Sequence, residues 1–205
     1  MRNRNFSGNW SIRMESWIIQ DGNYDDFKLG QMATFALQCH MEQISVPSKV
    51  LKKRALPVTT ELGIEGAYCI EAEVICNHPS SGMWFIDFGV RAYLMAPENK
   101  GLETVDAVSG VAILTVDPYM YKELRGAEPA IPNLTYDWEI EKIEKVIVPF
   151  IRQPSSDPLR PYELVPDTSE LRLEPVQNTT AFEDNISDSY ILHCKLVDLS
   201  HKREG

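Results

Sequence analysis

The sequence predicts a mostly β protein, an antiparallel barrel or sandwich with one or two short helices and a long proline-rich loop. Three observations predict it: long stretches in which apolar and polar residues alternate, turn residues between these stretches, and a single segment with clear helix punctuation. Alternation with a period of two is typical of strands, because successive side chains point to opposite faces of a sheet.

The strongest alternation lies in a predicted β-hairpin over Ala67 to Ala96. Its arms read AYCIEAEVICN and MWFIDFGVRAYLMA, and the segment HPSSG connects them. A flat second arm of about 13 residues would span roughly 43 Å, longer than strands of globular proteins, so we expect a bend or bulge near Gly89. The apolar face of the hairpin, which we expect in the core, carries Tyr68, Ile70, Ala72, Val74, Cys76, Trp84, Ile86, Phe88, Val90, Ala92 and Leu94.

Two strands are predicted before the hairpin, at Trp10–Ile19 and Met32–Met41. In each, apolar residues alternate along the segment, and turn residues such as Asp21 and Gly22 lie between the two. Residues 43–66 are compatible with a short edge strand or one helical turn. They contain a local basic cluster, which consists of Lys49, Lys52, Lys53 and Arg54.

Three elements are predicted after the hairpin. Val111–Val116 is apolar on both faces and predicts a central strand. Asp117, Pro118 and Gly126 are the residue types expected before, at the start of and after a short helix. Leu134–Phe150 predicts a strand, and its apolar alternation changes phase part-way along, which predicts a bulge near Lys142.

The rest of the chain predicts a loop and a closing strand. Residues 152–188 contain five prolines and many acids, and they predict a Pro-rich loop or wrapping segment with one short strand at Leu171–Val176. Residues 189–199 predict a last strand that pairs into the sheet. Together these elements predict a single β domain over residues 1–205.

The arrangement is loosely similar to OB-type barrels. The order of strands, the turn followed by KLGQMATFAL and the long bulged strands carry this resemblance. It implies single-strand nucleic-acid binding as one possible function. The charge argues against it, because residues 1–60 hold eight Lys and Arg against five Asp and Glu (+3), whereas residues 61–205 hold twelve against twenty-five (−13). An acidic body repels phosphates.

Composition excludes several other classes. A hydrophobic fraction of 43% supports a proper core, and no apolar run approaches the roughly 20 residues of a membrane helix. The N-terminal MRNRNFSGNW has no apolar segment of the signal-peptide type, so we expect a cytoplasmic protein with no membrane association. Four cysteines in a chain of 205 residues do not form a disulfide framework.

Neither a metal site nor a cofactor is predicted. Cysteine lies close to histidine three times, at Cys39-His40, at Cys76 and His78, and at His193-Cys194. The three cysteines are expected on the apolar faces of their strands, His40 and His193 on the opposite faces and His78 in a turn, so one ion cannot gather them. The sequence has no nucleophile, phosphate-loop or dinucleotide motif, and no catalytic residue is predicted.

The mixed face of the hairpin holds the candidate binding residues. They are Glu71, Phe85, Asp87, Arg91 and Tyr93. Aromatic residues and arginine are enriched at binding surfaces. Two arrangements remain open for the charges, open solvent or the interior of a barrel, where they would be desolvated together with Glu73. For the aromatics, the alternative to exposure is cover from residues 152–188 or from another sheet layer.

We therefore expect a non-catalytic, acidic protein that binds a protein partner, with an immunity-type neutraliser of a basic partner as one example. A small-molecule-binding or hydrolytic β-barrel that uses Glu71, Glu73, Asp87 and Arg91 is the first alternative. A single-strand nucleic-acid-binding module that uses residues 49–54 is the second.

Overall fold

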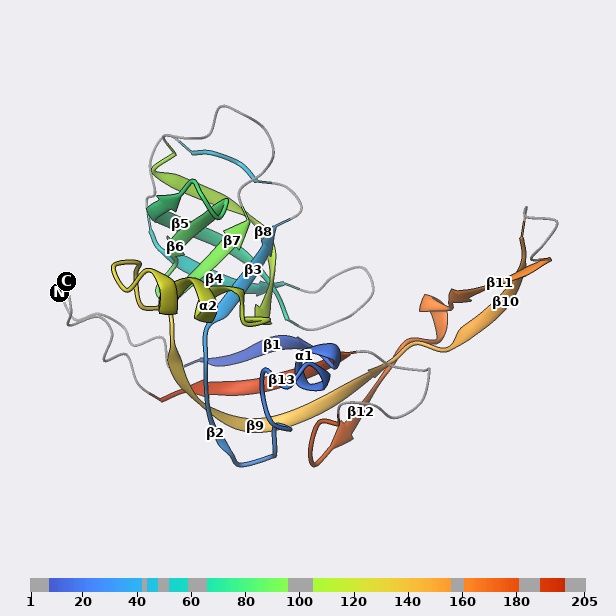
Figure 1. The fold of residues 1–205 in the computed structure, drawn as a ribbon. Helices are drawn as coiled ribbons and strands as arrows, with labels where there is room; N and C mark the ends of the chain where they lie inside the picture. The colour runs from blue at the N-terminus through green and yellow to red at the C-terminus, as the bar shows by residue number, and fades with distance from the viewer. Residues whose placement is uncertain are drawn as a thin grey trace.

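The computed structural model describes residues 8–41, 44–47, 52–58, 66–95, 105–155, 161–180 and 189–197. Thirteen strands and two short α-helices occupy these residues. Five of the strands close into a barrel in the order β8–β3–β7–β6–β5–β8 (Figure 1). The prediction of a mostly β barrel is confirmed. The barrel strands are β3 (Leu37–Met41), β5 (Ala67–His78), β6 (Met83–Asp87), β7 (Arg91–Met95) and β8 (Ala107–Val116).

The remaining long strands extend the sheet from the β8 side of the barrel. They are β1 (Asn9–Glu15), β13 (Ser189–Leu196), β9 (Tyr136–Ile147), β2 (Met32–Phe35) and β12 (Arg172–Val176). A parallel contact between Arg13 and Thr115 joins β1 to β8. In Figure 1 these strands lie below the barrel. β4 (Arg54–Val58) pairs with β5 and is the edge strand that residues 43–66 allowed.

One hydrophobic cluster contains residues from both the barrel and the added strands. Trp10 of β1 contacts Tyr68 and Phe88, with ring centroids 5.5 and 6.1 Å apart. Phe35 of β2 stacks on Trp138 of β9 at 5.5 Å. Because aromatic side chains bury large areas, the Trp10 contacts hold β1 against the barrel, and the Phe35–Trp138 stack holds β2 and β9 together.

The segment predicted as one strand, residues 32–41, forms two strands that pair with different neighbours. It is interrupted at Ala36, so that β2 pairs with β9 and β3 pairs with β8. The predicted strand 10–19 ends earlier than expected, because Trp17–Gln20 forms the one-turn helix α1. The alternating apolar residues of both segments nevertheless lie in the main cluster, except Ile18, which α1 places at the groove instead.

The second arm of the predicted hairpin is not one bent strand. The chain reverses at Phe88–Val90, and β6 pairs antiparallel with β7. Gly89 has φ +113°, a backbone conformation that side chains with a Cβ rarely adopt. The residues of the predicted apolar face still share one face after the reversal. Trp84 pairs with Leu94 and Ile86 pairs with Ala92, and all four lie in the main cluster.

Two bulges adjust the long strands. In β9, Ile140 and Lys142 pair with consecutive residues of β13, so Glu141 is the extra residue, and the bulge predicted near Lys142 is confirmed. A second bulge at Ile75 of β5 was not predicted. It turns Cys76 towards Phe85, away from the main cluster, and corrects the expectation that Cys76 shares a face with Tyr68.

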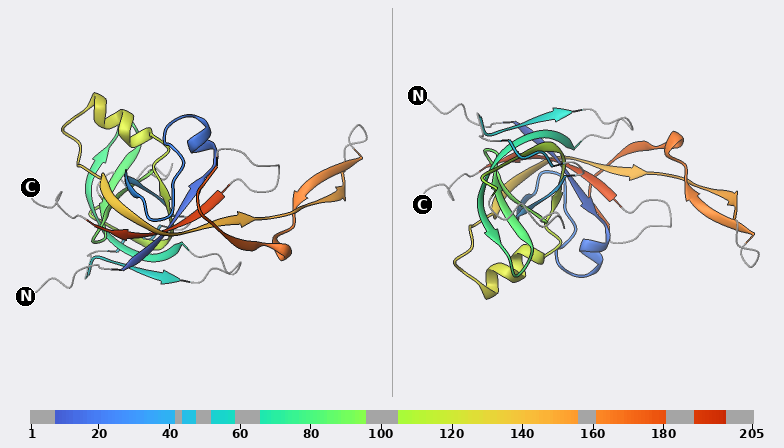
Figure 2. Two further views of the ribbon diagram at one scale, coloured as in Figure 1. Left: turned by 90° about the horizontal axis from the view of Figure 1, so that it is seen from below. Right: turned by 90° about the horizontal axis from the view of Figure 1, so that it is seen from above.

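Residues 150–176 differ from the predicted loop. The strand β12 confirms the short strand expected at Leu171–Val176, but two further strands were not predicted, β10 (Phe150–Pro154) and β11 (Tyr162–Pro166). They pair with each other in a sheet of their own. We call β10 and β11 the arm. In Figures 1 and 2 the arm extends away from the barrel, so its residues do not wrap the domain.

The glycine at the β6–β7 reversal gives a stability prediction. Gly89→Ala forces a Cβ into a left-handed backbone conformation and is expected to destabilise the fold by about 1–3 kcal/mol. Gly126 is the matched control, since it is exposed, lies within α2 (Met120–Ala127) and has open space around an added Cβ. Gly126→Ala should stabilise by about 0.5–1 kcal/mol. Urea denaturation measures both, and equal effects of the two substitutions would contradict the prediction.

Candidate functional site

Phe85 and Tyr93, two of the predicted binding residues, lie in a second hydrophobic cluster and are fully buried. Helix α2 and the segment after it cover them, with Tyr121 stacked on Tyr93 at 6.3 Å between ring centroids. None of the described residues in the range 152–188 belongs to this cluster. The two aromatics are therefore part of the protein's own packing and are not available to a partner, which corrects the sequence-based prediction for these two residues.

A buried carboxylate fixes α2 over this cluster. The Tyr93 hydroxyl donates to Asp117 Oδ1 at 2.8 Å, and the backbone N–H groups of Tyr121 and Lys122 donate to the same carboxylate at 3.1 and 3.3 Å. Asp117 thus supports the first turn of the helix, but the predicted bounds were wrong: Tyr119 directly precedes the helix, and Gly126, predicted after it, lies within it. Burial raises the pKa of Asp117 above its usual value in spite of these hydrogen bonds.

The predicted charged residues make local contacts on the outside of the barrel. Asp87 accepts the N–H of Gly89 at 2.8 Å and lies 3.0 Å from Lys53 Nζ, so it supports the β6–β7 turn. Glu71 forms an ion pair with Arg54 of β4. The backbone N–H of Arg91 donates to the Tyr136 hydroxyl at 2.8 Å, while its side-chain Nε is buried without a partner among the described residues. The main cluster takes the apolar face of these strands, so the charges share no cavity inside the barrel.

The same ion pairs neutralise part of the predicted basic cluster. Lys53 contacts both Glu73 and Asp87, and Arg54 contacts Glu71. Lys49 lies outside the described residues. Carboxylates beside two of the four cations oppose phosphate binding at this place, because each cation already faces an anion.

Two of the four cysteines are part of the hydrophobic core. Cys39 and Cys194 lie in the main cluster, and burial raises the pKa of the Cys39 thiol to about 12 and that of Cys194 above its usual value. A thiol held protonated is a poor nucleophile and metal ligand. Within the described residues, no three His, Cys, Asp or Glu side chains gather in a way that could hold a metal ion.

The structure contains a network of polar side-chain contacts that the sequence did not predict. Ser11 Oγ lies 3.2 Å from His193 Nδ1, His193 Nε2 lies 2.6 Å from Glu144 Oε2, and Lys142 Nζ lies 2.6 Å from Glu144 Oε1. The residues belong to β1, β13 and β9, which are direct neighbours. No local motif reveals such a group, because strand pairing brings together positions 11, 142–144 and 193. The network links β1, β13 and β9 across their outer face.

Tyr162 and Leu164 of the arm have the highest exposed fractions of the large hydrophobic side chains that the structure describes. Cross-strand partners share a face, so Phe150 and Pro166, Arg152 and Leu164, and Pro154 and Tyr162 lie together. Exposure is 46% for Phe150, 64% for Tyr162 and 65% for Leu164. The arm therefore presents a face that is apolar and aromatic except for Arg152, and we call it the arm face.

The chain matches no protein-family model, no curated protein and no solved structure. Among the described residues, neither helix has the length and apolar composition needed to cross a membrane. Function must therefore be inferred from the surfaces of this chain itself.

The buried contact between Tyr93 and Asp117 gives the second prediction. Asp117→Ala removes the acceptor of three hydrogen bonds and is expected to cost about 2–3 kcal/mol of unfolding free energy. Asp117→Asn keeps one acceptor oxygen in the same place without the buried charge, so it should recover part of that loss. Urea denaturation followed by tryptophan fluorescence measures both, and an Ala variant as stable as the Asn variant would refute the role of the carboxyl oxygen.

Glu144 gives a prediction of pH dependence. Burial raises its pKa, but Lys142 and His193 outweigh burial and lower the pKa below its usual 4.5. The ionised form therefore stabilises the fold fully above pH 4.5, and this contribution is lost as the pH falls through the lower folded-state pKa. Glu144→Gln should cost about 1–2 kcal/mol at neutral pH.

The difference between the wild type and Glu144→Gln should shrink as the pH falls below 4.5, which thermal unfolding across pH can follow. Glu139→Gln is the matched control on the same strand, because Glu139 is half-exposed and lies 3.6 Å from Lys195. An exposed pair of this kind contributes little. A difference for Glu144→Gln that is constant across this pH range would contradict the prediction.

Proposed function

We propose that this protein is a non-catalytic protein-binding module and that its arm face is the surface that docks onto a protein partner. One observation carries the proposal: Phe150, Tyr162 and Leu164 remain exposed together on a two-stranded sheet that stands away from the barrel. Exposed apolar patches of this kind are rare unless they bind something.

The composition of the arm face supports a protein partner. Tyrosine and arginine are the residue types that contribute most binding energy at protein interfaces, and Tyr162 and Arg152 lie on the same face. A hairpin of two strands is marginally stable by itself in water. Insertion into an apolar cleft of a partner would bury Leu164 and Phe150, and would leave the Arg152 guanidinium to pair with an acceptor at the rim of that cleft.

Charge supports a partner different from this chain. The net charge is −10, and residues 61–205 carry all of the excess. Two such bodies repel each other, whereas a basic protein is attracted to the acidic body while the arm enters its cleft. The proposed partner is therefore a protein with a basic surface around an apolar cleft. Neutralisation of such a partner is the role that this chemistry supports best.

The proposal can be tested with an arm variant, Tyr162→Ser combined with Leu164→Ser, beside a control, Val111→Ser. Val111 is 53% exposed on β8, so the control removes an exposed apolar side chain from the body. Each immobilised protein is incubated with lysate from the cells that naturally produce it, at low and high salt. A basic protein retained by wild type and control, but not by the arm variant, is then purified and titrated against all three.

The arm variant should weaken direct binding at least about 30-fold, which corresponds to the loss of one strong interface residue. Its thermal stability should remain near that of the wild type, because both substituted side chains are exposed. The proposal fails if the arm variant binds the purified partner as tightly as the wild type, or if the wild type retains no protein at low salt. It also fails if the chain forms a dimer that the arm variant abolishes.

A further inference from the structure

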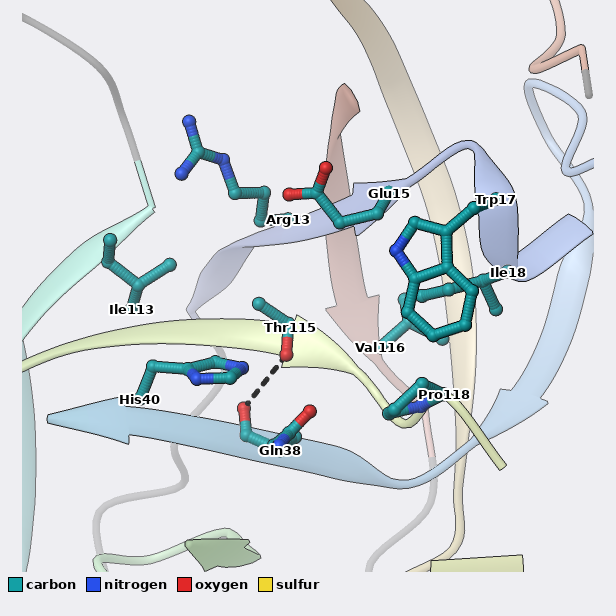
Figure 3. A pocket seen from close by; sticks show the side chains of 10 residues that line it. All are labelled: Arg13, Glu15, Trp17, Ile18, Gln38, His40, Ile113, Thr115, Val116 and Pro118. Carbon is teal, nitrogen blue, oxygen red and sulfur yellow. Dashed lines mark hydrogen bonds between the residues drawn. The ribbon is translucent and has the colours of Figure 1, made fainter. Parts of the chain in front are cut away.

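A groove crosses the outside of the barrel where β1, β8 and β3 lie side by side (Figure 3). Its volume is about 380 Å³, within the range of small-molecule sites. The floor is a cross-strand row, since Arg13 pairs with Thr115 and Thr115 pairs with Gln38. With neighbouring strands about 4.8 Å apart, the outer two backbone positions of this row are roughly 10 Å apart.

Two of the three polar side chains along this row, those of Arg13 and Gln38, have hydrogen-bonding groups without a partner among the described residues, whereas the Thr115 hydroxyl donates to the Gln38 backbone carbonyl. Gln38 is only 7% exposed, and its side-chain amide has no hydrogen bond with any described residue. The Nε atom of Arg13 is buried and likewise unpaired within the described part of the chain. Buried polar groups are nearly always hydrogen-bonded, so the buried, unpaired Nε of Arg13, with the unpaired Gln38 amide on the same row, points to a ligand that supplies the missing partner.

A third polar group lies beside them. His40 follows Gln38 on the same face of β3 and lines the groove near Ile113. Burial and the charge of Arg13 lower the pKa of His40 below 6.5. At neutral pH Arg13 is therefore the cation of the groove, and the imidazole is a neutral hydrogen-bonding group.

The other end of the groove is apolar. Trp17, Ile18, Val116 and Pro118 form this end, and Figure 3 shows the Trp17 ring beside Pro118. Trp17 is 45% exposed, whereas the other three tryptophans of the chain are at most 4% exposed. An exposed indole beside a proline offers a flat surface against which a planar apolar group can pack.

We propose that this groove binds a small organic carboxylate with a planar apolar body. Arg13 pairs with the carboxylate, the Gln38 amide hydrogen-bonds to it or to a neighbouring polar atom, and the planar body lies against Trp17. A guanidinium presents parallel N–H donors that match the two oxygens of a carboxylate. A polyanion is disfavoured, since Glu15 lines the same groove and the net charge of the chain is −10. This site shares no residue with the arm face.

The test uses benzoate, 2-naphthoate and indole-3-carboxylate as probes, with benzamide, acetate and inorganic phosphate as matched compounds that lack the charge or the planar body. Binding is measured by calorimetry. Contact with Trp17 is measured by the protection of tryptophan fluorescence from the neutral quencher acrylamide. At least one aromatic carboxylate should bind saturably and protect Trp17, and it should bind at least about tenfold more tightly than its amide or phosphate.

Arg13→Met should weaken binding of that probe at least about tenfold, and Gln38→Leu should weaken it less. Arg172→Met, an exposed arginine on β12, is the control and should leave the affinity unchanged. Trp17→Phe keeps a planar ring and should retain binding while it removes the quenching signal. Thermal unfolding of each variant confirms that it is folded.

The inference is overturned if none of the three aromatic carboxylates binds saturably. It is also overturned if benzamide or phosphate binds as tightly as the aromatic carboxylate. The same holds if Arg13→Met binds that carboxylate as tightly as the wild type does. These outcomes do not bear on the proposal that the arm face binds a protein, since the titrations contain no protein partner.

Discussion

The pairing of β8 on both of its edges is the constraint on which the rest of the structure depends. One edge of β8 pairs with β5 and, further along through Thr115 and Arg13, with β1, and the other edge pairs with β3; the pairing with both β5 and β3 closes the barrel. A closed barrel leaves no unpaired strand edge in its wall. The same strand therefore excludes water from the core and attaches the added strands to the barrel, so that Trp10 of β1 packs against Tyr68 and Phe88.

This closure determines which surfaces remain for binding. The mixed face of the hairpin is taken up by contacts within the protein, because α2 covers Phe85 and Tyr93, and Glu71 and Asp87 form ion pairs with Arg54 and Lys53. The arm lies beyond the closed sheet and keeps Tyr162 and Leu164 in solvent. The outer side of β1, β8 and β3 forms the groove. The two candidate binding surfaces are thus consequences of what the barrel does not cover.

Features that depend on the local alternation of residues were predictable from the sequence, and features that depend on the path of the chain were not. Apolar faces were predicted correctly even where the chain path was not: Trp84 and Leu94 face the core although the chain reverses at Gly89. A reversal around an odd number of residues keeps alternate residues on the same face, so the pattern could not reveal it. The bulge near Lys142 was found because a bulge shifts the alternation itself. The bulge at Ile75 was not found, because apolar residues lie on both sides of it.

The sequence by itself determined that this chain is a β protein, which side chains form most of the main cluster, that a short helix follows Val116 and that the body is acidic. These properties follow from residue spacing and composition, which act over a few positions. Only the tertiary structure decided which strands are neighbours, and with them the row of Arg13, Thr115 and Gln38, the cover over Tyr93 and the exposure of Tyr162. Such contacts depend on strand pairing between distant segments, and the alternation of a strand specifies its faces but not its partner.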